Sequence, residues 1–217
     1  MNRSFDFSNS LAYDYFMTKK IAYIFLFAAL LFPYSKAMAI VSPLSISLVP
    51  PLQFPTSEFT VTGARISLLW GKHRDIYGID LGVLGNITEG NFVGIGISGI
   101  FNLTQGKTTI TGLQLAGLAN INTKEAKIVG LQAALGINEN DVASTLVGLQ
   151  ISAIANLSAF TNIYGAQIGL YNHALEVYGL QIGLVNSAKN LHGVQIGLLN
   201  FNDEGLFRVS PILNIGF

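Results

Sequence analysis

The chain has 217 residues with 12 Lys or Arg and 12 Asp or Glu, so its formal net charge is zero and only 11% of its residues are charged. This balance argues against a nucleic-acid partner, because neutralising phosphates requires a basic stripe. The absence of cysteine excludes disulfides, a thiolate metal site and a cysteine nucleophile. So low a charge is unusual for a soluble secreted domain and is expected of a membrane protein.

The start of the chain has the pattern of a bacterial secretory signal peptide. The basic segment Met17–Lys20 precedes an unbroken apolar run at 21–32 (IAYIFLFAALLF), and Ala37–Ala39 has the small-x-small form of a cleavage site. The run is too short for a typical transmembrane helix. Residues 1–16 place acidic and aromatic residues ahead of the basic segment, which favours a start codon assigned too early. We therefore expect residues 1–39 to be removed on export.

A proline-rich segment follows at residues 40–57. It contains four prolines: Pro43, Pro50, Pro51 and Pro55. Because proline cannot donate a backbone hydrogen bond to a sheet, this segment is expected to be an interrupted edge strand or a tail. The remaining residues, 58–217, are expected to form one β domain built from repeats.

Internal repeats run through most of this domain. Each unit begins with Gly and closes with Asn, and successive opening glycines are 14 to 18 residues apart. The units are GIDLGVLGN (78–86), GIGISGIFN (94–102), GLQLAGLAN (112–120), GLQAALGIN (130–138), GLQISAIAN (148–156), GAQIGLYN (165–172), GLQIGLVN (179–186) and GVQIGLLN (193–200). Short polar connections such as TKEA and SAKN separate them. The closing Asn is interpreted as a turn residue, since its side chain can bond its own backbone.

Apolar residues alternate with small or amide residues inside each unit, which indicates β-strands and not helices. In the unit at 178–185, Tyr178, Leu180 and Ile182 share the apolar face, while Gly179 and Gln181 share the other. The alternation predicts an inward polar column. Its expected members are Asp80, Gln114, Gln132, Gln150, Gln167, Gln181 and Gln195.

Most charged residues lie in the connections, and two of the exceptions are expected to pair. Arg65 lies within the strand expected at 59–70, and Asp80 occupies the Gln position of its unit. A tight turn over residues 71–74 would place the two opposite each other across a first hairpin, facing inward. With a last strand at 207–217, about ten strands are expected.

Two architectures can use such units. The favoured one is an antiparallel up-and-down transmembrane β-barrel of about 10 strands (10–12), because its strands span the membrane with 9–11 residues and alternate lipid-facing and lumen-facing side chains. The position before the opening glycine is then an interfacial rim, at Tyr77, Tyr164, Tyr178 and His192. The alternative is a β-solenoid in which each unit is one coil and Gln or Asn stack in ladders. The uniformly short connections favour the solenoid, and the drifting coil length argues against it.

The sequence shows two resemblances, and the first of them supports the barrel interpretation. Phe207, Val209, Pro211, Leu213 and Ile215 alternate up to the final Phe217, and this strand resembles the terminal strand of bacterial outer-membrane β-barrel proteins. The resemblance implies that Phe217 is read by the barrel assembly machinery. The strings of G-L-Q-I-G-L-x-N over residues 76–202 are similar to those of bacterial surface-repeat proteins of unknown function.

The sequence points to a non-enzymatic outer-membrane or surface protein with a structural or interaction role. The three histidines, His73, His173 and His192, are interpreted as rim or turn residues, and no nucleophile motif accompanies them. No cofactor and no metal is expected. The expected partners are outer-membrane lipid and, during biogenesis, the assembly machinery; a periplasmic or secreted location is the alternative. A small channel and a lipid-modifying outer-membrane enzyme are the alternative functions.

Overall fold

The computed structural model describes residues 40–140 and 142–217, and the expected signal peptide lies outside the described residues. The chain divides into two units, Met1–Met38 and Ala39–Phe217, and everything below concerns the second. Among the described residues, no helix is long and apolar enough to cross a membrane.

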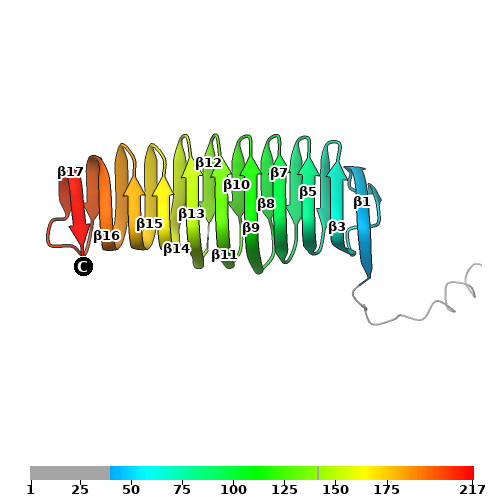
Figure 1. Cartoon of the computed structure of the whole chain (residues 1–217), viewed down its shortest axis with the longest axis horizontal. Helices are drawn as coiled ribbons and strands as arrows, with labels where there is room; N and C mark the ends of the chain where they lie inside the picture. Colours follow the sequence, from blue (N-terminus) through cyan, green and yellow to red (C-terminus); the bar gives the residue numbers. More distant parts are fainter. Residues whose placement is uncertain (1–39, 141) are drawn as a thin grey trace, which may run out of the picture. The chain divides into compact units, whose positions relative to one another are not determined.

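The repeat-built domain is a β-solenoid of about nine turns, so the expected antiparallel barrel is wrong. Neighbouring repeats pair in parallel: β11 (Ala126–Ala134) lies between β9 (Thr108–Ala116) and β13 (Ser144–Ser152), with Gly aligned on Gly and Gln on Gln. A hairpin barrel would alternate strand direction. Each repeat is instead one coil that returns the chain to the start of the next (Figure 1).

Two parallel sheets face each other across the coil. The long-strand sheet contains β9, β11 and β13 together with β3 (Thr60–Ser67), β5 (Ile76–Gly82) and β7 (Phe92–Ser98). The short-strand sheet contains β4 (Trp70–His73), β6 (Gly85–Thr88), β8 (Phe101–Thr104), β10 (Ala119–Asn122) and β12 (Ile137–Asn140). The short strands explain the wrong prediction. They lie in segments that the sequence presents as turns and connections, and period-two alternation fixes a strand's faces without fixing the direction of its neighbours.

The last coils are shorter because one corner of the coil loses its loop. In β14 (Ala155–Ile168), β15 (Tyr171–Ile182) and β16 (Val185–Asn202), a single strand runs from the short-strand sheet into the long-strand sheet. In the longer coils a loop separates the two strands at this corner. The pairing of β14 with β15 shifts register between Ser158 and Asn162, which absorbs the difference. Most of the drift in coil length, which argued against a solenoid, therefore falls at this corner. The other corner changes by one residue, since the segment from the opening Gly to the closing Asn has nine residues in the first five units and eight in the last three.

Separate strands cover the two ends of the stack. The proline-rich segment forms β1 (Val41–Val49), which pairs in parallel with β3, and β2 (Leu52–Phe54), which pairs antiparallel with β1. At the other end β17 (Val209–Gly216) pairs antiparallel with β16.

The core is a set of straight columns that run along the stack. One column is apolar and buried in every coil, and it comprises Val61, Ile76, Phe92, Ile110, Ile128, Leu146, Ile163, Val177 and Leu191. The opening glycines form another column and adopt positive φ, for example +136° at Gly130. A Cβ atom on Gly130 would overlap the carbonyl oxygen of Gly112 in the preceding coil. Glycine is required there by both backbone conformation and space.

Candidate functional site

The Gln residues of the predicted inward column are buried between the two sheets of the solenoid. Each side-chain amide donates from Nε2 to the Oε1 atom of the Gln in the preceding coil, as in Gln132 to Gln114 at 2.8 Å and Gln195 to Gln181 at 2.7 Å. The same contact joins Gln150, Gln167 and Gln181 to the Gln before each of them. Asn214 of β17 extends this Gln ladder by donating to Gln195 at 3.2 Å. The solenoid thus has an amide ladder in its buried interior where the barrel interpretation expected a lumen.

The Gln ladder begins at Gln114 because the preceding coil has glycine, Gly96, in that position. Gly96 pairs in register with Gln114 on one side and with Asp80 on the other. A Cβ atom on Gly96 would lie 3.0 Å from Cζ of Phe92, so the Phe92 ring occupies the space that a side chain would take. Asp80 shares the column but belongs to a different set of contacts.

A second ladder is formed by the asparagines that close the units; the solenoid alternative allowed Asn to stack in this way, whereas the turn interpretation of these residues did not. These residues are buried in the short-strand sheet, and each Nδ2 donates to the Oδ1 of the Asn in the following coil over 2.7 to 3.0 Å. The Asn ladder comprises Asn86, Asn102, Asn120, Asn138, Asn156, Asn172, Asn186 and Asn200. Nδ2 of Asn102 also donates to the Leu115 carbonyl at 2.9 Å, and the other members make similar bonds to backbone carbonyls. Donation therefore runs toward the C-terminal coils, opposite to the Gln ladder. The strict recurrence of Asn in the sequence is the signal of this ladder, although asparagine at this spacing also fits a turn.

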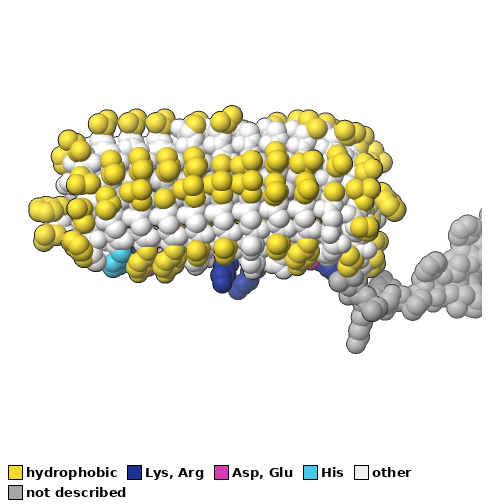
Figure 2. Space-filling view, in the orientation of Figure 1, with side chains coloured by type: hydrophobic (Ala, Val, Ile, Leu, Met, Phe, Trp, Pro, Cys, Tyr) yellow, Lys and Arg dark blue, Asp and Glu magenta, His cyan; other side chains and the backbone are white. Residues whose placement is uncertain are grey.

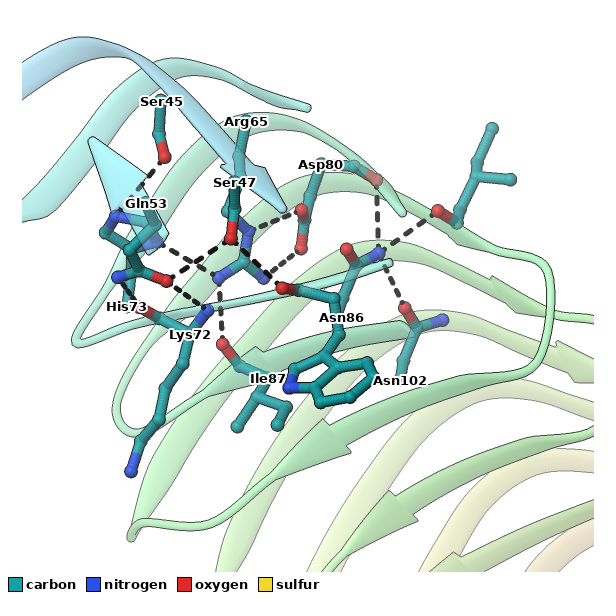
Figure 3. A network of polar contacts seen from close by, with 12 residues as sticks. Ser45, Ser47, Gln53, Arg65, Lys72, His73, Asp80, Asn86, Ile87 and Asn102 are labelled. Carbon is teal, nitrogen blue, oxygen red and sulfur yellow. Dashed lines mark hydrogen bonds and ion pairs between the residues drawn. The ribbon is translucent and has the colours of Figure 1, made fainter. Parts of the chain in front are cut away.

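Arg65 and Asp80 form a buried, bidentate ion pair at the N-terminal end of the stack (Figure 3). Arg65 donates from Nε to Oδ1 at 2.7 Å and from Nη2 to Oδ2 at 2.6 Å, and its side chain is fully buried. The two residues are aligned because β3 and β5 stack in parallel, so the expected hairpin is wrong although the residues meet. Nη1 of Arg65 donates to the Ile87 carbonyl at 2.8 Å, which helps to satisfy the buried guanidinium.

His73 completes this N-terminal polar cluster. Its Nε2 lies 3.2 Å from the Pro55 carbonyl oxygen and its Nδ1 lies 3.4 Å from Nη1 of Arg65. Burial and the neighbouring Arg65 charge lower the pKa of His73 to about 4. The neutral ring then donates from Nε2 to Pro55 and accepts at Nδ1 from Arg65. The sequence analysis interpreted His73 as a rim or turn residue; the structure places it under β1 and β2, where it joins the end-covering strands to the first coils.

The expected rim aromatics lie on the outer face of the long-strand sheet, in the column before the opening glycines. Tyr164 and Tyr178 stack with ring centroids 4.8 Å apart, and Tyr178 stacks on His192 at 4.5 Å. Tyr77 lies in the same column several coils away. Desolvation and the nearby Glu176 carboxylate raise the pKa of the Tyr178 hydroxyl. Phe217, the expected assembly signal, is fully exposed beyond β17. Its role in assembly stays a prediction that rests on the barrel resemblance.

Large apolar side chains cover the outer face of the long-strand sheet. They form two adjacent columns, and Figure 2 shows rows of hydrophobic side chains along the length of the domain, with Lys and Arg along one margin. The first column comprises Ala64, Ile79, Ile95, Leu113, Leu131, Leu149, Ala166, Leu180 and Val194. The second comprises Ile66, Leu81, Ile97, Leu115, Ala133, Ile151, Ile168, Ile182 and Ile196. We call these two columns the apolar face.

The described residues contain no group of three or more His, Asp or Glu side chains arranged to hold a metal ion. The structure does bring Ser187 beside His173, because the two residues are aligned in adjacent coils, but no hydrogen bond joins their side chains. Among the described residues, the strongest candidate for a functional site is therefore the apolar face. No protein-family model, curated protein or solved structure matches the chain.

Proposed function

We propose that this chain is a non-enzymatic structural protein of the bacterial cell envelope that acts through its apolar outer surface. The observation that carries the proposal is the apolar face. Ile79 and Ile95 in one column, and Ile97 and Ile196 in the next, each expose more than 40% of their surface. Proteins that act alone in water seldom expose a contiguous apolar surface of this extent, and such surfaces mark interaction sites.

The interior suits a rigid support for that surface. The Gln and Asn ladders bond each coil to the next through buried side chains, in addition to the backbone pairing of both sheets. Buried amide networks with their bonds made fix a single arrangement of the core. The exposed columns are consequently held at the regular spacing of about 4.8 Å between paired strands.

Export and an envelope location are part of the proposal. They rest on the signal-peptide pattern of residues 17–39, and outer-membrane lipid is the expected partner. The low charge of the chain supports a location beside lipid more than one in bulk water.

Cell fractionation tests the proposal. Expressed in a bacterial host, the wild-type chain is expected in the envelope fraction. A variant with Ile95→Glu and Ile97→Glu, which places two carboxylates on the apolar face, is expected to shift to the soluble fraction. A matched control, Thr109→Glu with Thr145→Glu, adds the same charge to an outer column that is already polar and is expected to stay with the envelope. Recovery of the wild-type chain in the soluble fraction, or equal behaviour of the two variants, contradicts the proposal.

The alternative functions have separate tests. A small channel predicts ion conductance in planar bilayers. A lipid-modifying enzyme predicts lipid turnover that His173→Ala abolishes, since His173 has Ser187 as its neighbour in the next coil.

A further inference from the structure

In every coil, the corner at which the long strand ends and the short strand follows is apolar. It exposes one or more branched aliphatic residues per coil, and the exposed fractions of the most exposed one in each coil range from 40% to 72%. We call this line of turns the apolar edge. Its exposed members are Leu68, Val83, Ile100, Leu118, Leu135, Ile154, Leu170, Leu184 and Leu198.

The backbone of the apolar edge is hydrogen-bonded from coil to coil. Leu118 N–H and Ala119 N–H both donate to the Ile100 carbonyl, at 2.8 and 2.9 Å. Leu184 N–H and Val185 N–H donate in the same way to Leu170, at 2.9 and 3.0 Å. A lipid layer offers no partner for backbone groups, so a segment that enters it must satisfy them internally. The N–H groups of these two turns meet that condition through the preceding coil.

Charged side chains gather at the opposite corner, which we call the charged edge. Lys107 pairs with Glu125 at 2.9 Å and Lys189 lies 3.5 Å from Glu204, all of them exposed. Lys127 lies at the beginning of its long strand, on the same side. Among the described residues, none of the turns of the apolar edge contains a charged residue.

Between the two edges, polarity changes in order along each long strand. From the charged edge the outer columns are polar, then a column that is aromatic at Tyr77, Tyr164, Tyr178 and His192 and Val or Thr in the four coils between Tyr77 and Tyr164, and then apolar up to the apolar edge. Tyrosine is enriched where protein crosses from lipid headgroups to hydrocarbon. The order of these columns matches the polarity profile of one side of a lipid layer.

The depth of the apolar part also matches. In β11 and its turn, six residues separate Val129, in the column of the aromatics, from Leu135 on the apolar edge, which is about 20 Å along a strand. The hydrocarbon core of a bilayer is about 30 Å thick and the bilayer with its headgroups about 40–45 Å, so one leaflet contributes about 15 Å of hydrocarbon and extends to about 20 Å with its headgroups. Immersion of the apolar edge in a single leaflet would leave the aromatic column at headgroup level and the charged edge in water.

Apolar residues lie on both sides of this edge, which favours a fluid partner over a flat protein surface. On the short-strand sheet Trp70, Phe101 and Ile137 begin their strands beside the turns. A second copy packed on the long-strand sheet would leave this side uncovered, whereas acyl chains can surround an edge. We propose that the solenoid inserts edge-on into one leaflet of a lipid layer, with the apolar edge in the acyl chains. This inference rests on the proposed function and names its partner and orientation.

The single tryptophan of the chain makes the insertion measurable. Trp70 begins β4 directly after the turn at Leu68. The full chain is mixed with phosphatidylcholine–phosphatidylglycerol vesicles whose acyl chains carry bromine, and Trp70 fluorescence is expected to fall relative to unbrominated vesicles. Vesicle flotation alone does not decide, because the apolar run at 21–32 is present in every variant and can itself bind lipid.

Matched variants locate the contact. Leu118→Glu, Leu135→Glu and Leu184→Glu together place three carboxylates on the apolar edge, and bromine quenching of Trp70 is expected to fall at least tenfold. Thr109→Glu, Thr145→Glu and Asn190→Glu add the same charge beside the charged edge and are expected to leave quenching unchanged. Far-UV circular dichroism establishes that both variants remain folded.

Three outcomes overturn the inference. The first is no quenching in the wild-type chain, and the second is equal quenching in both variants. The third is a wild-type dimer in light scattering that becomes a monomer only in the apolar-edge variant, while vesicles change the Trp70 fluorescence of neither protein. If vesicles fail while the apolar-face variant still leaves the cell envelope, the proposed function stands with a protein partner. If both fail, the proposed function fails as well.

Discussion

The Gln ladder predicts a specific pattern of non-additive destabilisation. Gln150 makes three side-chain hydrogen bonds: it donates to Gln132, and it accepts from Gln167 and from the Ser158 hydroxyl. Gln150→Leu fills most of the same volume but leaves Gln132 Oε1 without a donor, and Gln167 Nε2 and the Ser158 O–H without an acceptor, although the Ser158 oxygen still accepts from Asn140 at 3.1 Å. Gln132→Leu leaves two, since Gln132 donates to Gln114 and accepts from Gln150.

The magnitudes follow from the number of groups left unpaired. A buried polar group without a partner costs about 1–3 kcal/mol, and we use the lower part of this range, about 1–2 kcal/mol per group. The free energy of unfolding is then expected to fall by about 3–6 kcal/mol in Gln150→Leu and by about 2–4 kcal/mol in Gln132→Leu, before the gain from burying leucine. In the double variant the bond between the two glutamines vanishes with both partners, and three groups are left unpaired. The singles sum to five, so the double variant should be about 2–4 kcal/mol more stable than the sum predicts. The leucine gain cancels in this difference.

Urea unfolding followed by far-UV circular dichroism gives the four free energies. Val147→Thr, on the exposed outer face of the same strand, is the control and is expected to change the free energy of unfolding by less than about 0.5 kcal/mol. Agreement of the double variant with the sum of the singles to within about 0.5 kcal/mol would show that the ladder bonds do not stabilise the core.

Three further predictions follow from single positions. The folded-state pKa of His73 is about 4, below the 6.5 of an unperturbed histidine, so its contribution to stability is complete above pH 6.5 and is lost as pH falls toward 4; the loss is about 3 kcal/mol, and urea midpoints against pH should show it in the wild-type chain but not in His73→Gln. Asp80→Asn leaves the buried Arg65 charge without its counter-ion and should lower the free energy of unfolding by about 3–5 kcal/mol; a change of melting temperature under about 2 °C contradicts this reasoning. Gly130→Ala introduces both a Cβ overlap and an unfavourable positive φ, costing about 1–3 kcal/mol or more, whereas Gly96→Ala meets only the end of a ring and should cost less; equal thermal midpoints would refute the difference.

The sequence predicts which residues lie on each face of a strand, but it does not predict the direction of the neighbouring strands. Alternation is local, so Gln132 could be assigned to the inner side and Leu131 to the outer side from the pattern alone. Whether the next strand runs parallel or antiparallel depends on where the chain goes between units. That path is set by four-residue strands such as β8, too short for a convincing period.

The roles of Asn102 and His73 were hidden for a different reason. Asparagine is common in turns, and a turn interpretation accounts for its spacing without any ladder. The burial of His73 is imposed by β1 and β2, which come from a proline-rich segment whose sequence predicts a tail as readily as a strand. The outer apolar face was visible in the sequence; the charged corner opposite it became apparent only once the coils were stacked.

The opposite polarity of the two ladders has a consequence for the length of the stack. Each ladder is a line of side-chain amide dipoles, and a line of aligned dipoles accumulates charge at its ends, as backbone amides do in a helix. Donation toward the N-terminal coils in the Gln ladder and toward the C-terminal coils in the Asn ladder makes the two fields oppose each other. Adding or removing a coil changes both lines together, so neither end acquires a growing potential. Repeat number in this architecture can therefore change by whole coils, and a chain in which residues 126–143 are duplicated should fold with one more coil and an unaltered charge distribution at its ends.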